Sequence, residues 1–130
     1  MKSIRRHLRI SPKKVNLVAD LVRGKNVEEA ISFLRFTPKK SAKPLMEAIK
    51  SALANAEQNF RQHKKDLFVD QIIVNDGTRL KRSRPVSRGR SHPILKKLSH
   101  ITVHLAVKSE EAAKPEKTEK AKVETPTAAV

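Results

Sequence analysis

The stretch from Thr78 to His100 limits the possible folds of this chain more than any other segment, because it carries eight cations and no carboxylate. An alternating pattern typical of β-strands flanks it on both sides. A two-stranded ribbon is marginal in water, and like charges that face each other across its strands repel. We therefore expect a dense array of anions, with polyphosphate as the obvious source, to hold this stretch extended. The cations are Arg79, Lys81, Arg82, Arg84, Arg88, Arg90, Lys96 and Lys97.

The charge of the whole chain indicates the same kind of partner. Residues 1–108 hold 25 Lys and Arg against 8 Asp and Glu, a net charge of +17, whereas residues 109–130 hold 4 and 5, a net charge of −1. Such a balance suits a surface that lies against nucleic acid or an anionic membrane. Short apolar runs and the absence of a signal-peptide pattern predict a cytoplasmic protein without a membrane partner. Because cysteine is absent, disulfides and thiolate metal sites are excluded.

Three amphipathic segments predict helices. The first is expected over 12–23 after a Ser-Pro cap, with Gly24 as its stop, and the second over 27–36 after Asn26. The third is expected from Thr37-Pro38 to about residue 59, with Pro44 as the alternative start of its regular part. The apolar positions at helical spacing are Val15, Val18, Ala19, Val22, Val27, Ala30, Ile31, Leu34, Leu45, Ala48, Ile49, Ala52, Leu53 and Ala56.

Three alternating segments predict strands. Over 2–10 the alternation points Ile4, Leu8 and Ile10 to the core. Over 67–75 it places Phe68, Ile72 and Val74 on one face and Val69 and Ile73 on the other. Over 100–108 the inward residues are Ile101, Val103, Leu105 and Val107. The predicted fold class is α+β, with three helices packed on a small three-stranded antiparallel sheet.

Two strands of this sheet are expected to extend into a long basic β-hairpin, an arm at about 77–100. Asp76-Gly77 is a strong signal for a two-residue turn, but that turn would pair a strand with a segment that has little to bury. A bulge at Gly77 lets 67–75 pair with 100–108 and moves the reversal to 85–89. At about 3.3 Å per residue, limbs of about a dozen residues would project on the order of 40 Å.

The domain organisation follows from these patterns. Residues 1–108 are predicted to form a single RNA-binding domain that includes the arm. Residues 109–130 consist largely of Ala, Lys, Glu, Pro and Thr without periodicity. Such a segment lacks the apolar surface that would offset its ordering entropy, so we expect a disordered tail.

The candidate binding residues are the eight arm cations together with Lys13, Lys14, Arg23 and Lys25 around the first predicted helix. For these last four residues, a solvated helix face is the alternative. No nucleophile elbow, phosphate-binding glycine loop or carboxylate pair is present, so no catalytic residue, cofactor or metal site is predicted. A basic helix-turn-helix DNA-binding protein is the second hypothesis, although the densest charge lies in the arm.

Four stretches, in the same order, resemble the universal large-subunit ribosomal protein twenty-two family of bacterial type. They are Ser11-Pro12-Lys13-Lys14-Val15 with Val18-Ala19-Asp20-Leu21-Val22-Arg23-Gly24-Lys25; Ser51-Ala52-Leu53-Ala54-Asn55-Ala56-Glu57; Leu80-Lys81-Arg82 leading through Pro85 to Gly89-Arg90; and Ser99-His100-Ile101-Thr102-Val103. Together they span about residues 4–108.

The resemblance implies a structural constituent of the large ribosomal subunit that binds its rRNA and aids its assembly. It also implies that the hairpin tip lies in the wall of the nascent-peptide exit tunnel. The expected partners are rRNA, neighbouring ribosomal proteins and, transiently, the nascent polypeptide, without homo-oligomers. The implied tunnel-facing tip is Arg82, Ser83, Arg84, Pro85, Val86, Ser87, Arg88, Gly89 and Arg90.

Overall fold

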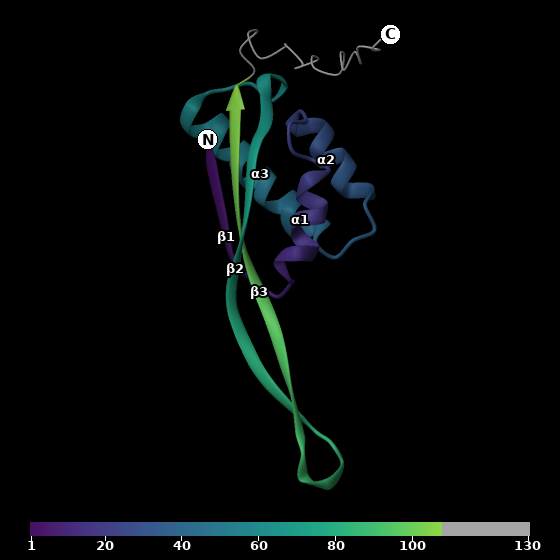
Figure 1. Ribbon diagram of the computed structural model, residues 1–130. Coiled ribbons are helices and arrows are strands. Elements are labelled where there is room, and N and C mark those ends of the chain that lie inside the picture. Colours follow the sequence, from purple (N-terminus) through teal and green to yellow (C-terminus); the bar gives the residue numbers. More distant parts are fainter. Residues whose placement is uncertain (108–130) are drawn as a thin grey trace, which may run out of the picture.

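The computed structural model of the chain describes residues 1–107 (Figure 1). Lys108 and the predicted tail at 109–130 lie outside the described residues. The elements follow the order β1 (Lys2–Leu8), α1 (Pro12–Asp20), α2 (Val27–Phe36), α3 (Ala42–Phe60), β2 (Leu67–Pro85) and β3 (Ser91–Val107), with short 3₁₀ turns at Lys64–Asp66 and Ser87–Gly89.

The three strands form an antiparallel sheet in the order β1-β3-β2, so the last strand is central. The helices gather around the upper part of this sheet, and the lower parts of β2 and β3 project beyond them as a two-stranded arm (Figure 1). The predicted α+β class, with three helices, a three-stranded antiparallel sheet and an extended hairpin, is confirmed.

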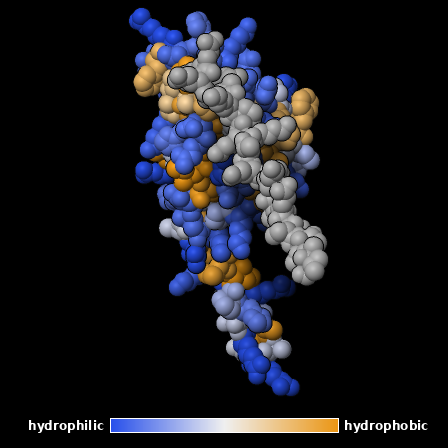
Figure 2. All heavy atoms as spheres, turned by 45° about the horizontal axis from the view of Figure 1, so that its top comes forward, coloured by the Kyte–Doolittle hydropathy of each residue, from blue (hydrophilic) through white to orange (hydrophobic). Residues whose placement is uncertain are grey.

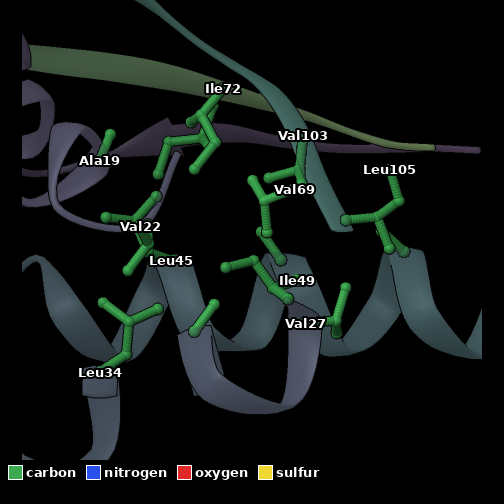
Figure 3. Close-up of a cluster of buried hydrophobic side chains, with 14 of the residues drawn as sticks. Ala19, Val22, Val27, Leu34, Leu45, Ile49, Val69, Ile72, Val103 and Leu105 are labelled. Carbon is green, nitrogen blue, oxygen red and sulfur yellow. The ribbon is translucent and has the colours of Figure 1, made fainter. Parts of the chain in front are cut away.

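One hydrophobic core joins the helices to the sheet. Val69 of β2 lies above Ile49 of α3, Leu105 of β3 belongs to the same cluster, and Val22 from the segment after α1 lies beside Leu45 (Figure 3). Of the apolar positions predicted from helical spacing, all are buried except Ile31, which is partly buried against the core. The predicted helical faces are therefore confirmed.

Two helix boundaries differ from the prediction. α1 ends at Asp20 and not at Arg23, because the chain then turns so that the N–H of Gly24, at φ +75°, donates to Val69 O at 2.8 Å. α3 begins at Ala42 and not at Thr37. The Thr37 hydroxyl donates to Phe33 O at 2.8 Å and closes α2, so it does not cap α3.

The predicted strand faces are wrong in part. Val107, predicted to point inward, is 40% exposed at the end of β3, and a bulge interrupts each of the first two strands. In β1 the register shifts between Arg5 and Leu8, where His7 adopts φ +56°, so Ser3 is buried and Ile4 is 48% exposed. In β2 the register shifts between Val69 and Gln71. An extra residue reverses the alternation, which puts Val69 on the core face together with Ile72.

The base and the turn of the arm agree with the prediction. The register shifts by one residue between Asp76 and Arg79, which is the expected bulge at Gly77, and the chain reverses between Pro85 and Ser91. Seven residue pairs lie between the bulge and this reversal.

Pro93 lies within this ladder opposite Ser83. Val86 N donates to Arg90 O at 2.8 Å. Since hydrogen-bonded and non-hydrogen-bonded pairs alternate in an antiparallel ladder, the Ser83–Pro93 pair is non-hydrogen-bonded. The missing N–H of proline therefore removes no rung.

Candidate nucleic-acid interface

The arm is exposed along its whole length beyond the bulge. Every residue from Lys81 to Lys97 is exposed, including the nine predicted tip residues, and Leu80 is half-buried. All eight predicted arm cations are accessible to a ligand. In Figure 2 the lower end of the molecule is mainly hydrophilic with isolated hydrophobic patches. Val86, Ile94 and Leu95 are the large apolar residues exposed there.

The cations of the arm are staggered across the two limbs. Lys81 lies opposite Leu95, Arg82 opposite Ile94, and Lys96 opposite Leu80. Arg84 lies opposite His92. Only one pair of cations, Arg79 and Lys97, faces each other directly across the ribbon, and this limits the expected repulsion. No Lys or Arg lies directly opposite any of the other paired cations.

Asp76 lies beside the one facing pair of cations. Its carboxylate accepts hydrogen bonds from Arg79 Nη2 at 2.6 Å and from Arg79 Nε at 3.2 Å. The hydrogen bond from Arg79 holds the pKa of Asp76 below its usual value, and the charge of Lys97 acts in the same direction. A carboxylate at the base of the arm thus offsets the repulsion where two cations meet.

A basic groove lies where the arm joins the body. This junction groove has a volume of about 390 Å³. It is lined by Arg9, Ser11, Leu80, Arg82, Lys96, Lys97 and Leu98. Three of its four cations are predicted site residues on the arm. The fourth, Arg9, follows β1 and was missed because its segment read only as the polar face of a strand.

A second basic groove continues along the body. This body groove is lined by Arg9, Ile10, Ser11, Lys14, Leu17, Val18, Lys39, Lys40 and Ser41. The Ser41 hydroxyl donates to Lys14 O at 3.2 Å and so ties the start of α3 to the first turn of α1. Lys39 and Lys40 were not predicted. A repeated pattern could have found them, because Thr37-Pro38-Lys39-Lys40 matches Ser11-Pro12-Lys13-Lys14.

Comparison of the sequence with known proteins identifies the family of this chain. A family model described as ribosomal protein L22p/L17e matches residues 3–106. The chain belongs to this family. The resemblance drawn from the four sequence stretches is thereby confirmed.

Three curated relatives, each named large ribosomal subunit protein uL22, are about half identical to this chain over the aligned residues. The large ribosomal subunit protein uL22 of Herpetosiphon aurantiacus is 53% identical over 102 residues, which cover 78% of this chain and 90% of that protein. That of Finegoldia magna is 48% identical over 78% of this chain and 91% of its own length. That of Thermotoga sp. (strain RQ2) is 47% identical over 85% of this chain and 69% of its own.

The family consists of structural proteins and not of enzymes, as the sequence predicted. Within residues 1–107 no three side chains of the His, Cys, Asp and Glu types come together as a metal site. None of the helices described is both long enough and apolar enough to cross a membrane.

The four predicted body cations of this family member lie at two ends of α1. Lys13 and Lys14 are exposed in its first turn, on the side of the arm. Arg23 donates to Asn16 Oδ1 at 3.0 Å and to Ile72 O at 2.8 Å, and it also pairs with Asp20. Lys25 places its Nζ 4.4 Å from the centre of the Phe33 ring. Arg23 thus fastens α1 to β2, and only the Lys13 end adjoins the grooves.

The opposite end of the body carries mixed charge. Glu28, Glu57 and Asp66 line one hollow with Arg61, Lys64 and Lys65, and Glu29 joins an adjacent one. Lys64 Nζ lies 3.3 Å from Glu57 Oε1. These four carboxylates are half of the eight in residues 1–108. The fold therefore separates a cationic arm end from an end where charges compensate one another.

Proposed function

We propose that this protein is a structural constituent of the large ribosomal subunit that binds large-subunit rRNA and aids its assembly. The observation that carries the proposal is the arm, in which eight exposed cations face solvent without a carboxylate between Thr78 and His100. The relatives are named as proteins of the large ribosomal subunit, which agrees with this ligand.

Charge neutralisation and shape explain the binding better than recognition of base sequence. Arginine can bridge two phosphate oxygens and can also stack on an exposed base. The four aromatic residues of the chain are all Phe, and none lies in the arm. Stacking platforms of the kind used by single-strand binders are therefore absent from the arm.

We further propose that the arm tip, at 82–90, lies in the wall of the nascent-peptide exit tunnel. A ribbon that projects from the body can pass through a layer of folded RNA that the body cannot enter (Figure 1). In this arrangement rRNA and neighbouring ribosomal proteins are permanent partners in the cytoplasmic ribosome, and the growing polypeptide is a transient one.

The alternative of a helix-turn-helix DNA-binding protein has little support in the geometry. Its reading helix would be α2, whose first turn carries Glu28 and Glu29. That turn lies at the end of mixed charge, away from the basic grooves. Phosphates would be repelled from the helix that has to approach them.

The salt dependence of binding to purified large-subunit rRNA tests the proposed ligand. If about eight phosphates are neutralised, the slope of log K against log salt is on the order of −6 to −7. Changing Arg79, Arg84 and Arg88 to Gln is expected to reduce its magnitude by about 2 to 3. A slope near −1 for the unaltered protein would remove the arm from the binding surface.

A crosslinking experiment tests the position of the tip. A photoreactive group at Arg84 or Arg88 in assembled particles is expected to crosslink to a growing polypeptide. The control is the same group at Gln58, which is exposed on α3 of the body. Crosslinks to nascent chain from Gln58 but not from the tip would contradict the tunnel position.

A further inference from the structure

The junction groove and the body groove share two residues, Arg9 and Ser11. Arg9 directly follows the last residue of β1, and Ser11 directly precedes α1. The short connection between these two elements therefore borders both grooves. The junction groove extends from it along the limbs of the arm. The body groove extends from it between α1 and the start of α3. The two grooves therefore form one path that bends at Arg9.

All the charged residues that line this path are cations. Its seven cations are Arg9, Lys14, Lys39, Lys40, Arg82, Lys96 and Lys97, and no carboxylate lines either groove. All seven are exposed. Within residues 1–107 none of them forms an intramolecular ion pair, whereas Arg5, Arg23, Lys64 and Arg79 each do. The side chains of these seven cations are therefore not engaged by carboxylates of the described chain.

We infer that the two grooves form one track for a single continuous run of RNA phosphates, which turns at Arg9 from the arm onto α1 and α3. This inference rests on the proposed function, because it takes RNA as the ligand. It adds the path of the RNA strand over the protein surface and assigns binding roles to Arg9, Lys39 and Lys40, which do not belong to the arm.

One RNA strand fits the shared Arg9 better than two RNA strands. Two RNA strands that converged on the shared Arg9 would bring their phosphates together and repel each other. A single strand that passes Arg9 avoids this repulsion, and the planar guanidinium can bridge two oxygens at the bend. The seven cations without a carboxylate also distinguish the path from a typical small-molecule site, which has only a few polar groups.

Matched triple variants test the track. One variant combines Arg9→Gln, Lys39→Gln and Lys40→Gln. The control combines Arg61→Gln, Lys64→Gln and Lys65→Gln, which remove the same residue types from the end of mixed charge. All six side chains are exposed, so both full-length variants are expected to melt like the unaltered protein.

The readout is the salt slope of binding to large-subunit rRNA. The track variant is expected to reduce the magnitude of the slope by about 2 to 3, and the control variant by less than about 1. Equal slopes for the two variants would overturn the track. If instead the unaltered protein lacked a steep slope, the proposed function itself would fail, so the two failures are distinguishable.

A cleavage experiment tests whether the run of phosphates is continuous. The chain has no cysteine, so Leu17→Cys in the body groove and Leu80→Cys in the junction groove each give a unique attachment point for a hydroxyl-radical-generating iron chelate. In assembled particles the two probes are expected to cleave adjacent positions of one rRNA segment. A Gln58→Cys probe supplies the background. Cleavage in two segments far apart in the rRNA sequence would overturn the single strand.

Discussion

Replacing Gly77 by alanine tests how tightly the bulge at the base of the arm packs. The new Cβ would lie 3.1 Å from Nε2 of His100 and 3.2 Å from the backbone carbonyl carbon of Leu98. The imidazole can rotate away from this contact. The backbone of Leu98 cannot move away, because Leu98 belongs to the central strand and its neighbours Lys97 and Ser99 are both paired with β2.

The expected cost follows from these two contacts. Overpacking of this kind costs about 1–3 kcal/mol. Rotation of the imidazole would also break the hydrogen bond of 3.0 Å that His7 N donates to His100 Nδ1, which is worth about 1 kcal/mol. We expect Gly77→Ala to lower the free energy of unfolding by about 2 kcal/mol and Tm by about 10 °C.

Thermal denaturation followed by far-ultraviolet circular dichroism measures this loss. Thr78→Ala is the matched control, because Thr78 is the exposed neighbour within the same bulge and its truncation is expected to change stability by less than about 0.5 kcal/mol. If Gly77→Ala melted at the same temperature as Thr78→Ala, the close approach of β2 to β3 at the bulge would be refuted.

Three further predictions concern the arm and its base. Deleting residues 79–97 is expected to leave a cooperative thermal melt, since none of the buried residues lies in that range, and a gradual melt would show that the arm belongs to the core. Ser99→Ala is expected to raise stability by up to about 1 kcal/mol in denaturant titration, because the Ser99 hydroxyl is buried without a hydrogen-bond partner among the described residues; a clear fall would contradict this. The lowered pKa of Asp76 means that its contribution is present above the unfolded pKa and is lost as pH falls through the folded pKa. The difference in Tm between the unaltered protein and Arg79→Gln should therefore vanish in strong acid, and a difference that persisted there would exclude the Asp76 pair as its cause.

The helical core and the course of the arm could be predicted from sequence because each depends on a local pattern. The spacing of Leu45, Ile49 and Ala52 specifies one face of a helix whatever its exact ends. The choice between a turn and a bulge at Gly77 was decided by matching two apolar strands, since a register that buries both faces is strongly favoured.

The strand faces and the helix start could not be predicted, because each depends on a contact with a distant residue. The bulges at His7 and after Val69 add a residue to a strand, and alternation alone does not show where one is inserted. At Thr37 the sequence gives a good cap, but the hydroxyl bonds backwards to Phe33. A Thr-Pro pair fits the end of one helix as well as the start of the next.

The candidate site was predicted where charge is dense along the chain and missed where folding assembles it. The arm cations are consecutive enough to be recognised directly. Arg9, Lys39 and Lys40 lie in separate segments, and they adjoin only because the start of α3 is fastened to α1 through Ser41 and Lys14. Arg23 also has a role within the body, since its guanidinium donates to Ile72 O, and its predicted RNA contact stays a prediction.

The staggering of cations against aliphatic residues along the arm has a consequence for the proposed binding of RNA. A ribbon that carries one facing cation pair, beside a compensating carboxylate, needs fewer anions to keep it extended than its total charge suggests. Binding of the arm to RNA would then require less ordering of the arm, so less chain entropy would be lost at that step. Under the proposed function, nucleotides of an immature particle would fold around an arm that is already largely extended.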